Sequence, residues 1–287
     1  MIYRNLILAL LAFIFVYTLP GCRSSQHRIS LPSQEYDLNY PAKLNLVEAL
    51  GEISGISFYP KDSSVFAISD EAGYLYKIHL NKRFITEQWK FDKKRDYEDV
   101  VQHDSSFYVL ESNGNIEKLN FARRGDTVST RRTIFPGNNE KKNEFESLYY
   151  DDVYKGFVMI CKDCEDDTYD FTTARLYDPV TDKYTQSIFR IDLHPIAERI
   201  GVENLKFRPS AAAVHPITSD VWVLSSTNEL LVVMDRKGTM KDVYTLNPVI
   251  FNQPEGIAFT PWGDLLIANE AGDNYAAGTL LIFKPKK

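Results

Sequence analysis

Apolar and polar residues follow one repeated order along most of this chain. A polar residue precedes a short strand of alternating apolar residues, a turn rich in Pro, Gly or Asp, and a second apolar strand, as between Gln253 and Asn269. Such alternation is typical of half-buried strands. Five copies are recognisable, and their anchoring polar residues are Ser54, Glu98, Glu146, Ser210 and Glu255.

Two further apolar segments follow the paired strands in most copies. Third strands are predicted at Tyr74–Ile78, Ile116–Asn120, Ala174–Tyr177, Leu230–Met234 and Thr279–Phe283. Fourth strands are predicted at Ile85–Phe91, Thr130–Ile134, Gln186–Ile191 and Lys241–Leu246. The anchors lie 44, 48, 64 and 45 residues apart, and a period near 45 with four strands per unit is the pattern of propeller blades. The sequence therefore predicts an all-β fold, a single five-bladed β-propeller.

The fifth copy has no fourth strand of its own. Residues Tyr36–Val47 precede the first copy and have no other partner, so we expect this N-terminal strand to close the last blade and leave no unpaired sheet edge. The alternative is a six-bladed ring with an extra blade inside the 64-residue interval. We instead expect that interval to hold a polar insertion at Lys162–Thr172, a long hairpin across Asp178–Asp182 and a short helix near Pro195–Arg199.

The N-terminal segment has the pattern of a bacterial lipoprotein signal. Arg4 is followed by an uncharged apolar run, Leu6–Val16, and then by Leu19-Pro20-Gly21-Cys22. A positive start, a short apolar core and small residues before a break are typical of secretory signals, and the run is short for a membrane span. We expect residues 1–21 to be a signal peptide, 22–34 a lipidated Cys22 with a polar tether, and 35–287 the propeller. An uncleaved anchor is the alternative.

This interpretation places the protein in the bacterial cell envelope. Acyl chains on Cys22 would anchor it stably in a lipid bilayer. No Asp follows Cys22, so an inner-membrane retention signal is absent. We therefore expect an outer-membrane anchor with the propeller facing the periplasm.

Charge narrows the choice of partner. The net charge is −6 and no basic stripe is present, which argues against nucleic acid as a partner. An acidic balance is compatible with a cation, although it also serves plain solubility.

Equivalent residues on the first strands of a propeller meet around the central channel. The anchors would form one ring, and strand alternation predicts a second layer two positions earlier. This second layer consists of Glu52, Asp96, Glu144, Arg208 and Gln253. Carboxylates so close together cannot all stay ionised without partners. They bind a hard cation such as Ca²⁺, which takes six to eight oxygens, or are neutralised by Arg208 and hydrogen bonds, or line a wide hydrated channel.

A further polar group comes directly after the second strands, and we expect it at one mouth of the channel. Its members are Asp70, Glu111, Lys162, Ser226 and Asn269. Loops at such mouths commonly carry function. Side chains of both charge signs would bind a polar or anionic ligand there. The alternative is that these residues form an ordinary solvated rim without a ligand.

Neither the cysteines nor any known sequence motif indicates a catalytic site. Cys161 and Cys164 form a C-x-x-C, which we expect to be a local disulfide or two free thiols, because no second pair or spaced His accompanies it for zinc. The sequence has no G-x-S-x-G, H-E-x-x-H, phosphate-binding loop or dinucleotide fingerprint. Nucleophilic or zinc-hydrolase catalysis therefore has no support.

Several of the repeated phrases resemble one known family. Ile53-Ser54-Gly55-Ile56, Ala67-Ile68-Ser69-Asp70, Tyr97-Glu98-Asp99-Val100, Phe145-Glu146-Ser147-Leu148 and Pro254-Glu255-Gly256-Ile257 are similar to the SdiA-regulated family of bacterial β-propeller proteins. The resemblance implies a five-bladed propeller of phytase-like shape, exported or membrane-tethered, with bound calcium. The fourth copy, Pro209-Ser210-Ala211, departs from the pattern because it has no Gly.

These observations favour a lipid-anchored binding or scaffold module over an enzyme. Its calcium site would use Glu98, Glu146, Glu255, Ser54 and Ser210, and its ligand would be a small molecule or a protein bound by a monomer. The alternative is a calcium-dependent hydrolase, a phytase-like phosphoesterase or a lactonase, with the three glutamates as metal ligands. Phytase-like hydrolysis needs a basic phosphate cleft, and few Lys or Arg fall on the predicted rim.

Overall fold

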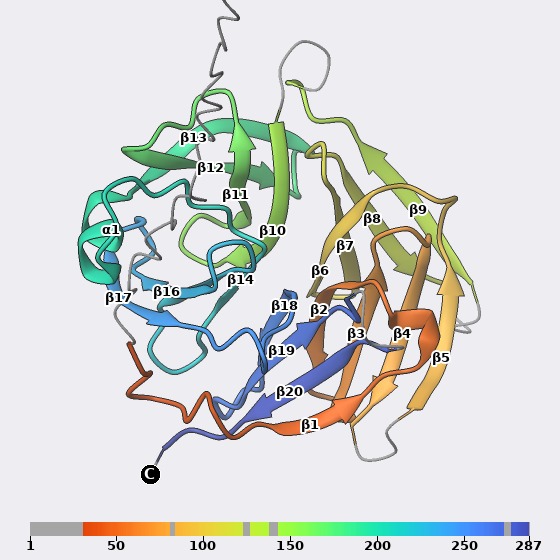
Figure 1. Cartoon of the computed structure of the whole chain (residues 1–287). Coiled ribbons are helices and arrows are strands. Elements are labelled where there is room, and N and C mark those ends of the chain that lie inside the picture. The colour runs from red at the N-terminus through yellow and green to blue at the C-terminus, as the bar shows by residue number, and fades with distance from the viewer. Residues whose placement is uncertain (1–30, 81–83, 123–126, 138–142, 273–276, 287) are drawn as a thin grey trace, which may run out of the picture.

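Five four-stranded antiparallel sheets stand around one axis in the computed structural model (Figure 1). The structure describes residues 31–80, 84–122, 127–137, 143–272 and 277–286. The predicted all-β, five-bladed propeller is confirmed, and the six-bladed alternative is wrong, because the 64-residue interval contains a single blade.

Four blades are built from consecutive strands, numbered from the axis outwards. Blade 1 contains β2 (Ile53–Tyr59), β3 (Ser64–Ser69), β4 (Tyr74–His79) and β5 (Phe84–Lys90). Blade 2 contains β6 (Tyr97–His103), β7 (Ser106–Glu111), β8 (Ile116–Phe121) and β9 (Val128–Thr133). Blade 3 contains β10 (Asn143–Asp151), β11 (Gly156–Cys164), β12 (Phe171–Asp178) and β13 (Lys183–Asp192). Blade 4 contains β14 (Ala211–Val214), β15 (Val221–Ser225), β16 (Leu230–Met234) and β17 (Met240–Thr245).

Blade 5 takes strands from both ends of the chain. It consists of β18 (Pro254–Phe259), β19 (Leu265–Asn269), β20 (Thr279–Phe283) and, outermost, β1 (Ala42–Asn45). The predicted closing strand is therefore confirmed, but it is shorter than Tyr36–Val47. Before it Tyr36 forms only an isolated bridge with Pro285, and after it a 3-10 helix, η1 (Glu48–Leu50), leads into blade 1.

The segment before β1 is tied to blades 4 and 5 by a buried tyrosine. The Tyr36 hydroxyl donates to the carbonyl oxygen of Gly263 at 2.6 Å and lies 2.9 Å from Nε2 of His215. Nδ1 of His215 accepts the backbone N–H of Thr218, so a neutral ring can donate from Nε2 to Tyr36. Burial lowers the pKa of His215, which favours this neutral form.

The 64-residue interval between Glu146 and Ser210 contains the predicted hairpin and the predicted short helix. The hairpin at Asp178–Asp182 joins β12 to β13, and the predicted helix is α1 (His194–Ile200). It ends at Gly201, whose φ of 73° lies in the left-handed region that glycine adopts at little cost. The polar insertion is shorter than predicted, because β11 continues to Cys164 and keeps Lys162 and Asp163 in the strand.

Apolar side chains are buried between neighbouring blades. Each of five clusters combines residues of two adjacent blades, such as Phe66, Val100 and Phe107 between blades 1 and 2. Trp222 is fully buried between blades 4 and 5, with the ring of Tyr36 at 5.4 Å. The core is therefore a ring of interfaces around the axis.

A β-bulge interrupts the alternation of four of the five innermost strands. The register between β6 and β7 shifts at Glu98, that between β10 and β11 at Glu146, and that between β18 and β19 at Glu255. In consequence Phe145 and Leu148, three residues apart, lie in the same cluster. Regular alternation would put residues two apart on one face. The bulges thus give each anchor glutamate an orientation of its own.

Among the residues that the structure describes, no helix has the length and apolar character needed to cross a membrane.

Candidate functional site

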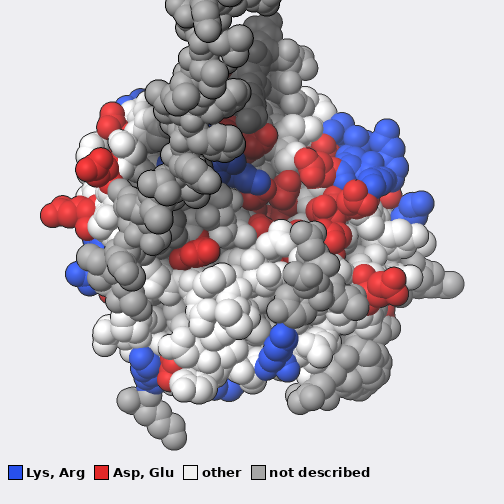
Figure 2. All heavy atoms as spheres, viewed as in Figure 1, with Lys and Arg blue, Asp and Glu red and all other residues white. Residues whose placement is uncertain are grey.

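The three anchor glutamates come from three different blades and converge at one mouth of the channel. Glu98 is the second residue of β6, Glu146 lies near the start of β10 and Glu255 is the second residue of β18, each half-buried at its bulge. Figure 2 shows acidic side chains gathered near the middle of this face beside a cationic one. Glu98 feels the charges of Glu255 and of Lys162, and Lys162 pairs with Glu146, so the fold brings the three glutamates near one another.

Lys162 supplies a cation to this group of glutamates. Its Nζ forms an ion pair with Oε1 of Glu146, and both side chains are largely buried. The ammonium also acts on two more carboxyls, because it lowers the pKa of Glu98 and of Glu255 against the effect of burial. Sequence reasoning placed Lys162 at the mouth but did not foresee that it would serve as the internal counter-ion.

Burial keeps a proton on most of the Glu98 carboxyl and on about half of the Glu255 carboxyl near neutral pH. Desolvation, with repulsion from Asp96, raises the pKa of Glu98 to about 8. Desolvation also raises the pKa of Glu255 to about 7, although the hydroxyls of Ser226 and Ser210 oppose it. A cation arriving at the mouth would therefore compete with protons for these oxygens.

A second group of carboxyls surrounds the three glutamates. Burial, together with Glu255, raises the pKa of Glu270 to about 8, and burial raises that of Asp70 to about 6. Both carboxyls also feel the charge of Glu52, which is exposed. Glu270 was missed by sequence reasoning, although it directly follows Asn269 in a polar stretch.

The predicted second layer does not form one ring. Glu52, Asp96 and Gln253 are exposed at the mouth, and Gln253 donates to Glu270 at 3.0 Å. Arg208 does not neutralise the glutamates as proposed from the sequence, because its guanidinium pairs with Asp163 at 3.2 Å. Half-buried Glu144 lies two residues before the bulge in β10.

Below the glutamates, polar groups join neighbouring inner strands. The Ser210 hydroxyl donates to the carbonyl oxygen of Pro254 at 2.7 Å and thereby joins blades 4 and 5. Asp99 accepts the backbone N–H of Val100 and of Leu148, each at 2.8 Å, and thereby joins blades 2 and 3. Ser54 is buried in the corresponding part of blade 1.

Asp99 is a buried carboxyl that sequence reasoning missed. Full burial raises the pKa of its side chain well above the ordinary value despite the two N–H donors. The sequence did carry a signal for this buried carboxyl, because Asp99 directly precedes Val100 inside a predicted inner strand. Asp99 also lines a cavity of about 200 Å³ among the inner strands, whose other lining residues are mostly apolar, such as Phe58, Val101 and Phe259.

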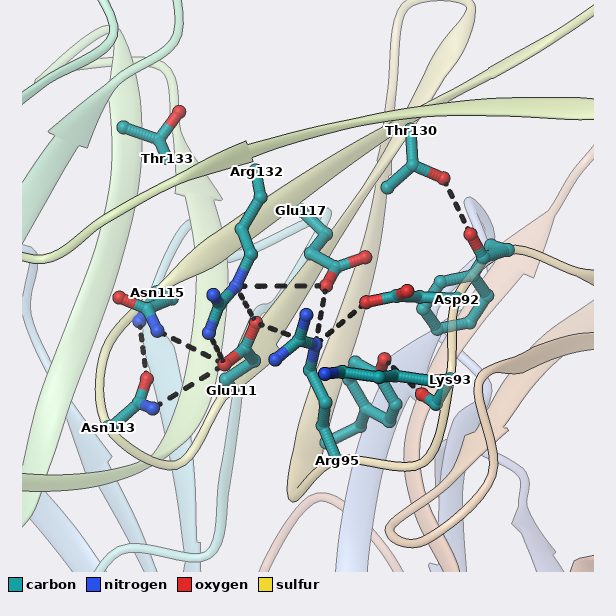
Figure 3. A network of polar contacts seen from close by, with 12 residues as sticks. Asp92, Lys93, Arg95, Glu111, Asn113, Asn115, Glu117, Thr130, Arg132 and Thr133 are labelled. Atoms are coloured by element: carbon teal, nitrogen blue, oxygen red, sulfur yellow. Dashed lines mark hydrogen bonds and ion pairs between the residues drawn. The ribbon is translucent and has the colours of Figure 1, made fainter.

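Glu111 and Asn269, which were predicted to lie at the mouth, are instead buried and form polar contacts inside the fold. Glu111 is buried within blade 2, where its carboxylate forms an ion pair with Arg132, lies 3.8 Å from Arg95 and accepts from Asn115 at 3.1 Å. Figure 3 shows this network, in which Glu111 and Glu117 lie between the two guanidinium groups. Asn269 donates to the carbonyl oxygen of Ile250 at 2.9 Å and is fully packed.

The cysteine pair forms a disulfide, which is one of the two states expected from the sequence. Cys161 and Cys164 are bonded at the end of β11, with their Cα atoms 5.7 Å apart. Among the described residues, Cys161, Cys164 and Asp167 are the only three His, Cys, Asp or Glu side chains whose ligand atoms all lie within 4.8 Å of one another. The glutamates are thus more widely spaced, and they would close in around a cation only by side-chain rotation.

Comparison with known proteins agrees with the fold. A sequence model of the SdiA-regulated family matches residues 28–275. Glutaminyl cyclase from Myxococcus xanthus superposes with a TM-score of 0.59 at 12% identity, over 90% of this chain and 97% of that chain.

Two further propellers are similar at the same low identity. The calcium-binding protein regucalcin from Agrobacterium tumefaciens gives a TM-score of 0.51 at 11% identity, over 86% and 96% of the two chains. A luciferin-regenerating enzyme gives 0.51 at 10% identity, over 85% and 95%. These likenesses show the fold alone. No curated protein matches the sequence significantly.

Proposed function

This chain belongs to the SdiA-regulated family, and from that premise we propose that it is an exported, lipid-anchored binding protein whose propeller binds Ca²⁺ at the glutamate mouth of the channel. The observation that carries the proposal is the convergence of Glu98, Glu146 and Glu255 from three blades, each at a bulge of the innermost strand. Bulges are frequent beside functional sites, where they re-aim a side chain.

The donor set at the mouth fits a hard cation. The groups that converge there are carboxylates, with the hydroxyls of Ser210 and Ser226 beside Glu255, and Ca²⁺ prefers such oxygen ligands. Glu98 and Glu255 carry raised pKa values because burial disfavours their charged forms, and the ammonium of Lys162 offsets this only in part. A divalent ion would supply further positive charge, and it would have to share Glu146 with Lys162 or displace the ammonium.

The anchor completes the proposal. Cys22, after the apolar segment, would carry the acyl chains, and the bilayer would be the outer membrane with the propeller facing the periplasm. Residues 1–30, which include Cys22, lie outside the described residues. The physiological ligand would be a small molecule or a protein that the Ca²⁺-loaded mouth recognises.

Thermal unfolding with and without calcium tests the metal site. At a Ca²⁺ concentration about 100 times the Kd, binding adds about 2.7 kcal/mol, which raises the Tm of a domain of this size by about 5 to 10 °C. We expect Glu146→Gln to remove most of this shift. Glu198→Gln, an exposed change on α1, is the matched control and should keep it. An unchanged Tm with calcium in the natural protein would contradict the proposal.

Lys162→Met separates a metal site from a self-contained charge network. If Ca²⁺ and the ammonium compete for Glu146, the variant should bind Ca²⁺ at least about tenfold more tightly, since about 1.4 kcal/mol of competition corresponds to that factor. Calorimetric titration measures the affinity. A variant that is destabilised and still binds no Ca²⁺ would show that the ion pair serves structure alone.

Enzyme assays distinguish the binding protein from a calcium-dependent hydrolase. The binding proposal expects the calcium-loaded protein to leave phosphomonoesters and lactones intact. Turnover that disappears in Glu146→Gln and persists in Glu198→Gln would favour the hydrolase.

A further inference from the structure

A small pocket opens beside the disulfide at the end of β11. Its volume is about 150 Å³, and its lining includes Cys164, Asp167, Tyr169 and Phe207. The pocket lies between the β11–β12 loop and the segment that leads into blade 4. A volume of this size holds several water molecules, so it accommodates a ligand as small as a free amino acid.

The two sulfur atoms have different surroundings. Cys161 is fully buried, and the hydroxyl oxygen of Thr173 lies 3.2 Å from its Sγ, within hydrogen-bond distance. Cys164 retains 5% of its exposure and lines the pocket. An attacking group in the pocket would therefore reach Sγ of Cys164, and Cys161 would be the leaving sulfur, with a hydrogen-bond donor in place to stabilise its thiolate.

A carboxyl group lies beside both sulfurs. A carboxylate oxygen of Asp167 is within 4.8 Å of each Sγ, and the Thr173 hydroxyl lies 2.9 Å from Asp167 and 3.2 Å from Sγ of Cys161, so its one proton can be donated to either acceptor. Burial raises the pKa of Asp167 above its ordinary value in spite of the Thr173 donors. Asp167 is thus placed to receive a proton from a thiol in the pocket and to return one to the leaving sulfur.

Charges of both signs line the pocket. Lys162 and Lys206 contribute ammonium groups, and Asp163 contributes a carboxylate that accepts from Lys206 at 3.1 Å. A ligand with one carboxylate and one ammonium could exchange into this pair. A neutral thiol of the same size would gain neither contact.

We propose that the Cys161–Cys164 disulfide is a redox-active site that exchanges with a small zwitterionic aminothiol of the free-cysteine class. The thiol sulfur attacks Sγ of Cys164, a new bond forms between these two atoms, and the bond from Cys164 to Cys161 breaks. The electron pair goes to Sγ of Cys161, and the proton of the thiol passes through Asp167 to that sulfur. A second thiol then releases Cys164, so that two thiols are oxidised to their disulfide and the protein is reduced.

This inference goes beyond the proposed calcium site and does not depend on it. Both cysteines belong to β11, whereas the glutamates belong to the inner strands, and the variants that test the two sites are at different residues. Lys162, which pairs with Glu146 and also lines the pocket, is left unchanged in the tests of this inference. It does require the oxidising surroundings of an exported protein, in which such disulfides persist.

Thiol exchange on the folded, full-length protein tests the proposal. The probe is L-cysteine, compared with 2-mercaptoethanol at equal thiolate concentration, and intact-protein mass spectrometry follows the mixed disulfide. We expect cysteine to react at least tenfold faster, to saturate with concentration and to be captured at Cys164. Equal rates for both thiols, or reaction only after denaturant unfolds the protein, would overturn the proposal. The disulfide would then have a structural role alone.

Three variants locate the chemistry. Asp167→Asn should slow exchange about tenfold with both thiols, whereas Asp170→Asn, an exposed change in the same loop, should not. Lys206→Met should remove the preference for cysteine and leave the rate with 2-mercaptoethanol unchanged. If Asp167→Asn fails to fold, Thr173→Val removes the donor to Cys161 and should give the same slowing. Unchanged rates in all variants would contradict the assigned roles.

Discussion

Buried charges in this propeller are balanced in three ways. Glu146 is paired with an ammonium, Asp99 accepts backbone N–H groups, and Glu117 is adjacent to two guanidinium groups that it shares with other carboxylates. Glu117 is fully buried, and neither of its oxygens accepts a hydrogen bond that would hold the negative charge. Burial, together with Asp92 and Glu111, raises its pKa to about 8, so a proton neutralises it at physiological pH.

The titration of Glu117 should be visible in stability. Because its pKa in the folded protein lies above the ordinary value of 4.5, its contribution is complete below pH 4.5 and is lost as the pH rises through about 8. We expect the unfolding free energy of the natural protein to fall by more than about 1 kcal/mol between pH 6 and pH 9, relative to Glu117→Gln. Urea unfolding at both pH values measures this, and parallel pH curves for the two proteins would contradict it.

At the scale of strands, the bulges and close contacts of the inner strands shape the channel. In blade 1 the register shifts between Ile53 and Ile56, and Gly55 lies against blade 2. An added Cβ at Gly55 would be 2.4 Å from the backbone nitrogen of Val100 and 2.5 Å from Cα of Asp99. Glycine thus permits the backbones of β2 and β6 to approach where Asp99 links blades 2 and 3.

Gly55→Ala should therefore separate these strands. Overpacking against a backbone costs about 1–3 kcal/mol, and we expect at least the upper part of this range because neither strand can yield alone. Gly51→Ala is the milder comparison, since its nearest contact would be 3.2 Å and its φ of −60° suits alanine. Denaturant unfolding compares the two, and equal stability of both variants would disprove the close approach.

Periodicity in the sequence predicted the blades, the closing strand and the meeting of Glu98, Glu146 and Glu255, because equivalent positions in a ring must be neighbours. It could not predict partners that depend on unequal details. Lys162 reaches Glu146 because β11 continues to Cys164, and this extension has no counterpart in the other blades. Arg208, the expected counter-ion, is instead drawn to Asp163. Alternation also fails at each bulge, where one extra residue reverses the facing of the later residues in the strand.

At the scale of the whole molecule, the first described residues belong to the propeller. Leu31 and Thr245 exchange hydrogen bonds, with Leu31 N–H donating to the Thr245 hydroxyl at 3.1 Å. Ser33 is buried, its hydroxyl accepts the N–H of Tyr36 at 3.2 Å, and its carbonyl oxygen accepts from Lys286 at 2.7 Å. Residues that the sequence assigned to a tether thus contact blades 4 and 5.

A chain that begins at Glu35 should be less stable than one that begins at Leu31. The shorter chain loses the contacts of Leu31 and Ser33, and we expect a cost of about 1 to 3 kcal/mol. Ser33→Ala in the longer chain should reproduce part of this loss, because the hydroxyl also accepts the N–H of Glu35. Urea midpoints measure the differences, and equal midpoints for the two chains would show that these contacts add nothing.

The pairing of β1 with β20 has a consequence for the order of events during synthesis. The outermost strand of blade 5 is among the first parts of the domain to be made, and the strand it must join is among the last. The ring cannot be completed while the ribosome is still adding residues before Phe283. The propeller ring therefore stays open until nearly all of the chain has been made. Such a delay would serve the export that we propose, because the ring would then close only after the chain has crossed the membrane.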